Sequence, residues 1–452
     1  MRNPTSPKTT GASNEEGAAT TAQKNSERRF KQPFTLTPQY FGSLLFDRIG
    51  VRYLPFDEEA TQLLIRLTTQ SVGELVANTE EKAKREQIEG FYFHLQPHGL
   101  FDQNGFAQLD VIDIEPPPDH LAAPLVTHVE VIGACNITCS HCFAGELPRN
   151  QNPLTLKELD DLFVELASLG CFRVSLTGGE PLMRNDIFEI IDSAERNGLA
   201  VSLATNGMLV DEQMAIKLGK RKSIRLTVSL DGATAESNDA VRGKGVFAKV
   251  AKGLEILRKH TSYAIGFTIT RGVASEVQQC VETAKELGAN AVVFRPLYPT
   301  GVALQNPDLM PTFEQYTDAI LEIAGEATLE EDVTELESQC GAGELLAGIS
   351  VQGEVNPCSF LGSGFVSGNI RQSSFKEIWN EGQQFKKLRE FADGIENQPK
   401  DSGCGKTFEG GCRCRSIDAF GDVNASDPWH AEYQANPDKF FFPLKNLVVR
   451  DE

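Results

Sequence analysis

The chain has 452 residues, of which 43 are lysine or arginine and 63 are aspartate or glutamate, so its formal net charge is −20. This negative charge argues against non-specific binding to nucleic acid or to anionic membranes. No apolar run reaches the roughly 20 residues that a membrane-spanning helix needs, and the N-terminus has no apolar signal core. We therefore expect a cytoplasmic protein of two or three domains.

The N-terminal region is expected to contain a tail and a small folded domain. Residues 1–30 are mainly polar, which is typical of disorder. Residues 31–114 alternate apolar and polar stretches. Asp57 and Ser71 each precede an apolar pattern of helical period, so each is expected to begin a helix.

Two further features of this domain complete the predicted order of elements. Residues 43–54 are expected to form two short strands around a turn at residues 47–50. Residues 91–95 and then residues 99–101, with the turn pair Asn104-Gly105, indicate a closing hairpin or wing.

This order of strands, helices and wing resembles the winged-helix peptide-recognition element of systems that modify ribosomally made peptides. The resemblance implies that the domain binds the leader segment of a precursor peptide by pairing it to an exposed strand edge. The alternative is that this domain has only a structural role and covers the next domain. Residues 115–124 contain three consecutive prolines and are expected to form a stiff linker.

Three cysteines follow an apolar run at residues 126–132, with the spacing Cys135-x3-Cys139-x2-Cys142. Three thiols cannot all pair in disulfides, and clustered cysteines in a reducing compartment are more often metal ligands. Cuboidal iron–sulfur clusters take one cysteine per iron, so three ligands for four irons would leave one iron open. A zinc site with His141 as a candidate fourth ligand is the alternative.

A second motif, Gly178-Gly179-Glu180-Pro181, follows a short apolar strand expected at residues 172–176. Glycines let the backbone approach a ligand closely, and Glu180 offers an acceptor for an ammonium group. Together the two motifs resemble the radical S-adenosylmethionine superfamily. The resemblance implies a [4Fe-4S] cluster on the three cysteines, with its open iron bound by the methionine moiety of S-adenosylmethionine. It also implies that the four residues of the second motif bind the methionine amine.

Residues 125–330 are expected to form a partial (β/α)6 barrel, because six apolar strands alternate with helices. Thr155 and Glu158 form a capping box at the start of one of these helices, and Gly170 is placed to end it. Right-handed crossovers curve such a parallel sheet. The strands are expected at residues 127–132, 172–176, 200–205, 224–230, 264–270 and 291–294.

Ligands of such barrels gather at the carboxyl ends of the strands, and both motifs follow this rule. Asn206-Gly207 ends the third strand, and Ser229 lies at the end of the fourth, with Arg242 shortly after. The superfamily resemblance implies that Ser229 and Arg242 contact the ribose and carboxylate of S-adenosylmethionine. An ordinary turn role is the alternative for each of them.

The C-terminal region, residues 331–430, holds five more cysteines. Cys340, the expected turn at Gly353, Cys358 and the run Cys412-Arg-Cys414 resemble the SPASM extension of peptide maturases, and in particular the radical enzymes of pyrroloquinoline quinone biosynthesis. The resemblance implies that Cys340, Cys358, Cys412 and Cys414 hold an auxiliary iron–sulfur cluster. A zinc site built from four of these five cysteines is the alternative.

The extension departs from the full SPASM pattern. The usual Cys-x2-Cys pair is reduced to Cys404, Phe408 stands four residues before Cys412, and His430 replaces the last cysteine. Phenylalanine cannot bind iron, so we expect one auxiliary cluster rather than two. Cys404 is expected to be a free thiol, with a role as a cluster ligand as the alternative. Residues 431–452 are expected to form a C-terminal tail.

These features predict a radical S-adenosylmethionine enzyme that cleaves its donor reductively to a 5′-deoxyadenosyl radical. The predicted substrate is a precursor peptide with a leader, modified at a C–H bond by crosslinking, epimerisation or backbone excision. Flavodoxin or ferredoxin is the expected electron donor. A small-molecule substrate and a non-enzymatic iron–sulfur or zinc scaffold are the alternatives. The sequence identifies no catalytic acid, base or hydrogen donor.

Overall fold

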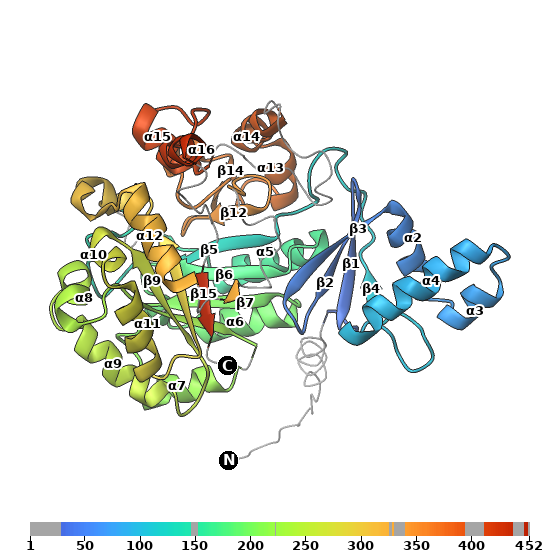
Figure 1. Ribbon diagram of the computed structural model, residues 1–452, viewed down its shortest axis with the longest axis horizontal. Coiled ribbons are helices and arrows are strands. Elements are labelled where there is room, and N and C mark those ends of the chain that lie inside the picture. Colours follow the sequence, from blue (N-terminus) through green and yellow to red (C-terminus); the bar gives the residue numbers. More distant parts are fainter. Residues whose placement is uncertain are drawn as a thin grey trace, which may run out of the picture.

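A computed structural model describes residues 29–145, 152–221, 223–324, 328–329, 340–393, 411–436 and 447–450. Three parts are visible: an N-terminal domain at one end, a central layer of parallel strands and helices, and a C-terminal extension above one edge of that layer (Figure 1). The predicted N-terminal tail up to residue 28, Cys404 and Phe408 lie outside the described residues.

The N-terminal domain is a four-stranded sheet with helices packed on it. Its strand order is β3-β2-β1-β4, in which β1, β2 and β3 are antiparallel neighbours and β4 pairs in parallel with β1. Three α-helices and the short 3₁₀ helix η1 (Gln96–His98) connect β3 to β4. The bounds are β1 (Phe34–Gln39), β2 (Gly42–Asp47), β3 (Arg52–Asp57), α2 (Glu58–Leu67), α3 (Val72–Ala77), α4 (Lys82–Leu95) and β4 (Leu109–Val111).

The predicted local signals of this domain are present in the structure. The carboxylate of Asp47 accepts hydrogen bonds from the backbone of Ile49 and Gly50, which closes the turn between β2 and β3. Asp57 caps α2, and Ser71 begins α3 with a complete capping box. These predictions are confirmed because a turn or a cap depends on neighbouring residues only.

The expected wing strand at residues 91–95 is wrong, because these residues form the last turns of α4. Ile88 and Leu95 are buried and Phe91 packs against the same core, which is the spacing of one helix face. The turn at Gly105 is present, but it joins only the single bridge between Phe101 and Ala107. The domain therefore closes through a parallel strand beside β1 rather than through a hairpin.

All six predicted barrel strands are present, and each neighbouring pair among them is parallel. They lie in chain order within one sheet, from β5 to β10. The sheet and its helices form the partial barrel that the sequence predicts (Figure 1). The strands are β5 (Val126–Ile132), β6 (Arg173–Gly178), β7 (Ala200–Thr205), β8 (Arg225–Leu230), β9 (Ala264–Ile269) and β10 (Ala291–Pro296).

The barrel helices pack on one face of this sheet. Thr155 and Glu158 form the predicted capping box of α5, and Gly170 ends it in the left-handed conformation. The helices are α5 (Leu156–Leu169), α6 (Ile187–Arg196), α7 (Glu212–Gly219), α8 (Ala235–Arg242), α9 (Val246–Leu257), α10 (Arg271–Ala274), α11 (Val277–Glu286) and α12 (Phe313–Ala324). No helix in the described part of the chain combines the length and apolar character that a bilayer crossing requires.

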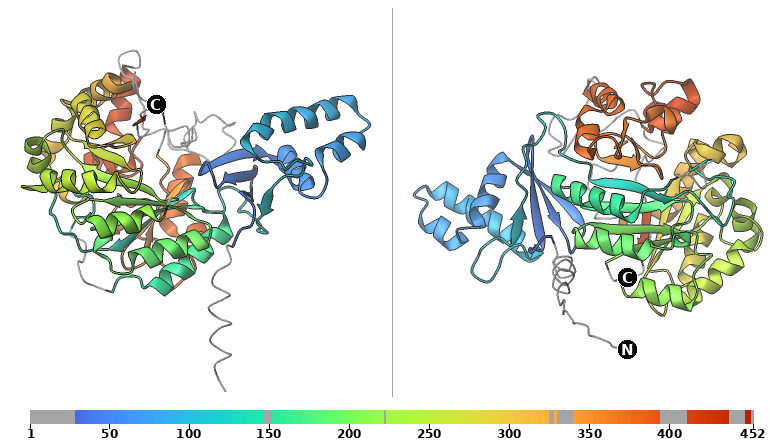
Figure 2. Two further views of the ribbon diagram at one scale, coloured as in Figure 1. Left: turned by 90° about the horizontal axis from the view of Figure 1, so that it is seen from below. Right: turned by 180° about the vertical axis from the view of Figure 1, so that it is seen from behind.

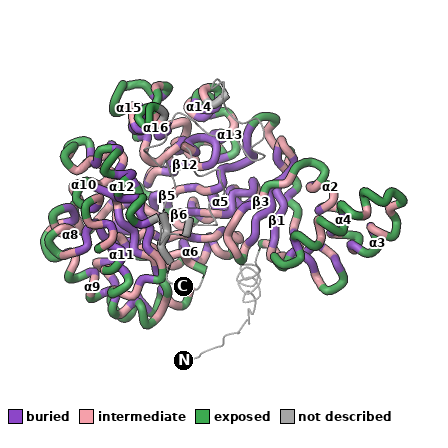
Figure 3. The backbone as a smooth tube through the Cα atoms, in the orientation of Figure 1, coloured by how far each residue is buried: buried purple, intermediate pink, exposed green. Residues whose placement is uncertain are grey.

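The two faces of the barrel sheet differ in character. Leu176, Leu203 and Val228 belong to the large apolar core shared with the helices. The alternate residues, such as Ser175 and Thr227, lie half-buried on the opposite face. Figure 3 shows the resulting buried centre of the molecule beneath a more exposed helical layer. A site can therefore form on this second, polar face and in the loops above it.

The C-terminal extension continues the barrel sheet at the β5 edge. Strand β12 pairs in parallel with β5, and β13 and β14 follow as antiparallel neighbours. At the opposite end, β15 pairs with both β10 and the short β11, so the expected C-terminal tail contributes a strand. The predicted boundary at residue 430 falls inside α16. The elements are β11 (Thr328–Leu329), β12 (Leu346–Ile349), β13 (Glu354–Asn356), β14 (Gly368–Asn369), α13 (Phe375–Glu381), α14 (Gln383–Asp393), α15 (Arg413–Phe420), α16 (Pro428–Ala435) and β15 (Leu447–Arg450).

Aromatic residues at the amino end of β6 attach the N-terminal domain to the barrel. Figure 2 shows this domain beside the barrel in two further views. The ring of Phe172 stacks on Phe46 at 4.9 Å between centroids, and Phe30 packs edge-on at 5.4 Å. The backbone N–H of Phe172 donates to the hydroxyl of Tyr53, which in turn donates to the carbonyl of Gly170. Buried polar and aromatic contacts of this kind hold the two parts in one orientation.

Candidate active site

The loop after β5 brings its three cysteines together as half-buried free thiols. Burial raises the pKa of Cys139 to about 12, and the nearby Cys142, Cys135 and Asp231 add to this effect while Arg242 opposes it. Thiols in such surroundings stay protonated unless a cation replaces their protons. Three adjacent sulfur ligands of this kind fit the corner of an iron–sulfur cluster.

The glycine motif is built directly onto this loop. The backbone of Gly179 donates to the carbonyl of Ile132 at 2.7 Å, and that of Glu180 donates to Ala134 at 2.9 Å. A Cβ atom at Gly178 would lie 2.2 Å from the oxygen of Ile132, and one at Gly179 would lie 2.1 Å from the oxygen of Ala134. The two glycines are therefore required for the contact between the two motifs, whatever they contribute to a ligand.

The carboxylate of Glu180 already accepts hydrogen bonds within the protein, which the sequence does not indicate. It accepts them from the hydroxyl of Thr205, the backbone of Asn206 and the backbone of Leu182, at 2.7, 2.7 and 3.0 Å. The side chain is only 1% exposed, and burial raises its pKa despite these donors. A carboxylate has about four acceptor positions, so one remains for the predicted ammonium group.

Asn206 links the end of β7 to the cysteine loop. Its amide nitrogen donates to the side-chain oxygen of Asn136 at 2.7 Å and lies 3.7 Å from the sulfur of Cys135. The loop is thus held by β7 as well as by the glycine motif.

Asp231 is one residue of this site whose role no sequence pattern indicated. Its side chain is fully buried, contacts His141 Nε2 and Arg242 Nε through one oxygen and accepts from the backbone of Thr268 through the other. Burial alone opposes its ionisation, but the charges of Arg242 and His141 outweigh this and hold the pKa of Asp231 at about 2. An Asp-Gly pair is a common turn signal, which hid this role in the sequence.

Arg242 and Ser229 occupy the predicted end of the barrel. Arg242 is buried in the last turn of α8, 2.6 Å from the Asp231 carboxylate and close enough to Cys139 to affect the pKa of that thiol. The backbone of Ser140 donates to the carbonyl of Val241, so α8 also supports the cysteine loop. Ser229 lies half-buried on the polar face of β8. Their contacts with a bound donor stay predictions.

Two titratable residues on the polar face of β5 were also missed, because they lie within an apolar run. Glu130 is 7% exposed; burial, opposed by a hydrogen bond from the backbone of Val351, raises its pKa to about 7. Burial, together with Arg295 and Arg173, lowers the pKa of His128 to about 4. Both groups therefore favour the uncharged form between about pH 4 and pH 7.

The four cysteines predicted to hold the auxiliary cluster also lie together. Cys340, Cys358, Cys412 and Cys414 belong to one small core with Leu361, Leu388 and Val423. Hydrogen bonding with Cys358 and Cys412 raises the pKa of Cys414, whereas hydrogen bonding with Cys414 lowers that of Cys412. Three separate segments thus bring four thiols into one volume, which is what a fully ligated cluster requires.

Buried ionic groups surround this second cysteine group. The carboxylate of Asp427 accepts hydrogen bonds from Nε and Nη2 of Arg415 and from the backbone of Cys412, at 2.7 to 2.9 Å. The Arg415 guanidinium also lies 4.1 Å from the ring centre of Trp429. These contacts fix the Cys412–Cys414 segment, and they depend on residues whose roles no local pattern indicates.

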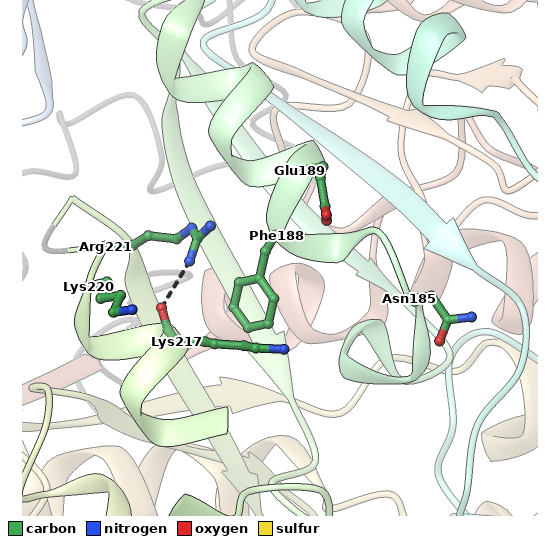
Figure 4. Close-up of a pocket in the computed structure, with 6 residues that line it drawn as sticks. All are labelled: Asn185, Phe188, Glu189, Lys217, Lys220 and Arg221. Carbon is green, nitrogen blue, oxygen red and sulfur yellow. Dashed lines mark hydrogen bonds between the residues drawn. The ribbon is translucent and has the colours of Figure 1, made fainter. Parts of the chain in front are cut away.

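Nowhere in the described ranges do three or more His, Cys, Asp or Glu side chains converge as the ligands of a single metal ion. A cubane cluster does not require such convergence, since each cysteine binds a different iron. A surface pocket of about 260 Å³ lies elsewhere, between α6 and α7, and is lined by Phe188, Lys217 and Arg221 among others (Figure 4). It shares no residue with either cysteine group.

Comparison with protein families identifies both parts of this arrangement. The radical SAM superfamily matches residues 129–283, and the SPASM iron–sulfur cluster-binding domain matches residues 340–407. An AdoMet-dependent heme synthase from Methanosarcina barkeri is 32% identical over 342 residues, which cover 68% of this chain and 96% of the relative. The mycofactocin maturase MftC of Mycolicibacterium smegmatis is 32% identical over 289 residues, covering 60% and 74%.

Solved structures show the same fold. Streptococcus suis SuiB bound to its precursor peptide SuiA has a TM-score of 0.62 and 16% identity, covering 89% of this chain and 99% of SuiB. The enzyme anSMEcpe with bound AdoMet has a TM-score of 0.55 and 19% identity, covering 70% and 96%. Neither the zinc alternative nor the scaffold alternative has comparable support. The chain therefore belongs to the radical S-adenosylmethionine superfamily, as an enzyme with a SPASM extension that uses a [4Fe-4S] cluster, S-adenosylmethionine and auxiliary iron–sulfur chemistry.

Proposed function

We propose that this enzyme modifies a ribosomally synthesised precursor peptide by abstracting a hydrogen atom from one of its C–H bonds. The observation that carries the proposal is the N-terminal sheet domain docked on a radical SAM and SPASM core in one chain. The fold match to SuiB supports this. It covers 89% of this chain, which is more than the barrel and the extension contain, so it includes part of the N-terminal domain. SuiB itself was solved with its precursor peptide.

The residues on the chain fit the cofactors that this chemistry needs. Cys135, Cys139 and Cys142 would hold the first cluster, and the remaining acceptor position of Glu180 would take the donor's amine. When bound, the cluster and S-adenosylmethionine supply the 5′-deoxyadenosyl radical after one-electron reduction. We propose that Ser229 and Arg242 orient the donor, and that a flavodoxin or ferredoxin in the cytoplasm delivers the electron.

The leader is proposed to bind at strand β3, which is an edge of the N-terminal sheet. Pro55 lies in this strand, and proline is tolerated in sheets at edges. Beside the edge, Phe56 of β3 packs edge-on against Phe91 of α4 at 5.9 Å, and both rings are only partly buried. An extended leader would pair with β3 and place apolar side chains against these rings.

A small-molecule substrate is the second candidate. The AdoMet-dependent heme synthase relative favours it, because the alignment covers 96% of that relative and only 68% of this chain. The similarity to this relative therefore does not require the N-terminal domain to be a recognition element. The two candidates differ in whether the reaction depends on a leader.

The test uses the full chain, reconstituted anaerobically with iron and sulfide, and a short peptide encoded beside its gene. With S-adenosylmethionine and dithionite, we expect a mass change in the full-length precursor and not in the leaderless peptide. Phe91→Ala is expected to weaken precursor binding about tenfold, while Phe93→Ala, on the same helix but 66% exposed, leaves it unchanged. Release of 5′-deoxyadenosine that is indifferent to the leader would count against a peptide substrate.

A further inference from the structure

The segment after β10, residues 298–306, contacts both cysteine loops, and we call it the bridge segment. It contains the short 3₁₀ helix η3 (Gly301–Gln305). No motif in the sequence pointed to it. Its contacts suggest a role that is independent of which substrate the enzyme uses.

On one side, the bridge segment is bonded to the loop of the first cluster. The backbone of Val302 donates to the carbonyl of Cys142 at 2.8 Å, and the Asn306 amide donates to the carbonyl of Ser140 at 3.0 Å. A Cβ atom at Gly301 would lie 2.3 Å from the oxygen of Phe143, and this glycine has a φ of +59°. The close approach thus depends on glycine.

On the other side, the bridge segment is bonded to the loop of the auxiliary site. The hydroxyl of Thr300 donates to the carbonyl of Phe360 at 3.0 Å, and the ring of Tyr298 stacks on that of Phe360 at 4.6 Å. The backbone of Phe360 also donates to the sulfur of Cys358 at 3.5 Å. Tyr298 packs against the core formed by the four cysteines.

The ring of Phe360 completes a direct connection between the two loops. It packs edge-on against Phe143 at 5.3 Å between centroids. Phe143 immediately follows Cys142, and Phe360 follows Cys358 by two residues. A chain of three rings therefore runs from a ligand of the first cluster to the ligands of the auxiliary cluster.

We propose that the bridge segment and Phe360 couple the two sites, so that a filled auxiliary site holds the first cysteine loop in the conformation that binds S-adenosylmethionine. Packed aromatic rings and short hydrogen bonds have few alternative arrangements, so a shift at one loop is passed to the other. Phe360 is a positioning residue in this proposal, since it acts through the loops and not on the substrate.

The test measures iron per chain and the concentration of S-adenosylmethionine that half-saturates the change in the EPR spectrum of the reduced first cluster. The double variant Cys358→Ser with Cys414→Ser removes two auxiliary ligands. It is expected to raise the half-saturating concentration about fivefold or more, a typical coupling between sites. Phe360→Ala is expected to cause a similar rise while the protein keeps the iron content of the parent.

Combining Phe360→Ala with the double cysteine variant should add little, because both changes break the same connection. Phe360→Leu keeps apolar volume and serves if the alanine variant folds poorly, with a smaller rise expected. Phe420→Ala, in the extension but 61% exposed, is the matched control. The proposal is overturned if Phe360 variants with full iron bind the donor as the parent does, or if the effects simply multiply.

Discussion

At the scale of single residues, Gly179 determines how closely the glycine motif and the cysteine loop approach each other. Its missing side chain allows the glycine motif to hydrogen-bond to the end of β5, where the cysteine loop begins. The sequence predicted that this glycine lets the backbone approach a ligand closely. In the structure, it also lets the backbone approach the carbonyl of Ala134.

Gly179→Ala is accordingly expected to lower the rate of 5′-deoxyadenosine formation at least tenfold, because a Cβ 2.1 Å from a carbonyl oxygen forces the two motifs apart. Chromatography of the reaction products measures the rate. Gly90→Ala is the control, since nothing lies within 4 Å of its position in α4. A Gly179→Ala enzyme with parental rate would show that the contact is dispensable.

Glu130 leads to a prediction about pH. Burial raises its pKa from 4.5 to about 7 in the native protein. Between these pH values the unfolded chain has released the proton and the native state still binds it, so this residue makes stability fall as pH rises. Glu130→Gln removes the effect. We expect it to be nearly neutral at pH 4.5 and to raise the free energy of unfolding by up to about 3 kcal/mol at pH 8.

Denaturant unfolding of metal-free protein at the two pH values measures this difference. Glu59→Gln, at an exposed position of α2, is the control and should show no such dependence on pH. If the difference between Glu130→Gln and the parent is the same at both pH values, then the carboxyl titrates normally.

Asp231 belongs to the scale of elements, because it joins the end of β8, the last turn of α8 and the cysteine loop. Asp231→Asn leaves Arg242 and His141 without their buried counter-charge. We expect a loss of stability on the order of 3 kcal/mol, together with weaker donor binding. Asp211→Asn is the control, since asparagine also caps a helix and Asp211 caps α7.

Thermal unfolding and 5′-deoxyadenosine formation, measured on the same samples, separate the two effects of Asp231→Asn. The stability that this carboxylate provides is present above its ordinary pKa of 3.8 and is lost as pH falls toward about 2. The parent and the variant should therefore converge in acid. A constant gap at all pH values would assign the effect to packing instead.

At the scale of the whole molecule, the arrangement of the two domains sets a minimum distance in the precursor peptide between the leader and the modified position. The N-terminal sheet, through Tyr53, contacts Gly170 and Phe172 at the amino end of β6, whereas Gly178 lies at the carboxyl end. A six-residue strand spans about 20 Å, so at least about six extended residues must separate a leader on β3 from the modified position.

Deleting residues between leader and modified position should therefore abolish modification abruptly, while leader binding persists. Mass spectrometry and a binding titration on the same deletion series test this. Inserted residues are expected to be tolerated, since longer loops cost little extra entropy. Modification that survives a spacer of two residues would place the leader elsewhere.

Local patterns in the sequence determined the barrel strands, the caps of α2, α3 and α5, and the first cysteine group, because each depends on residues that are neighbours in the chain. The second cysteine group comes from three separate segments and was predicted from the resemblance to the SPASM extension. The spacing of apolar residues gave a wrong prediction at residues 91–95. The aromatic residues there are compatible with a strand or a helix, and only their packing on the N-terminal core favoured the helix.

The tertiary structure alone decided the surroundings of the two sites. Asp231, the bridge segment and the pair of Arg415 and Asp427 act through contacts between residues that are not neighbours in the sequence. No local period marks such residues, since a buried charge or a ring stack is created only when the fold supplies its partner. The sequence thus determined which chemistry this chain performs, and the fold decided how the two cysteine groups are held together.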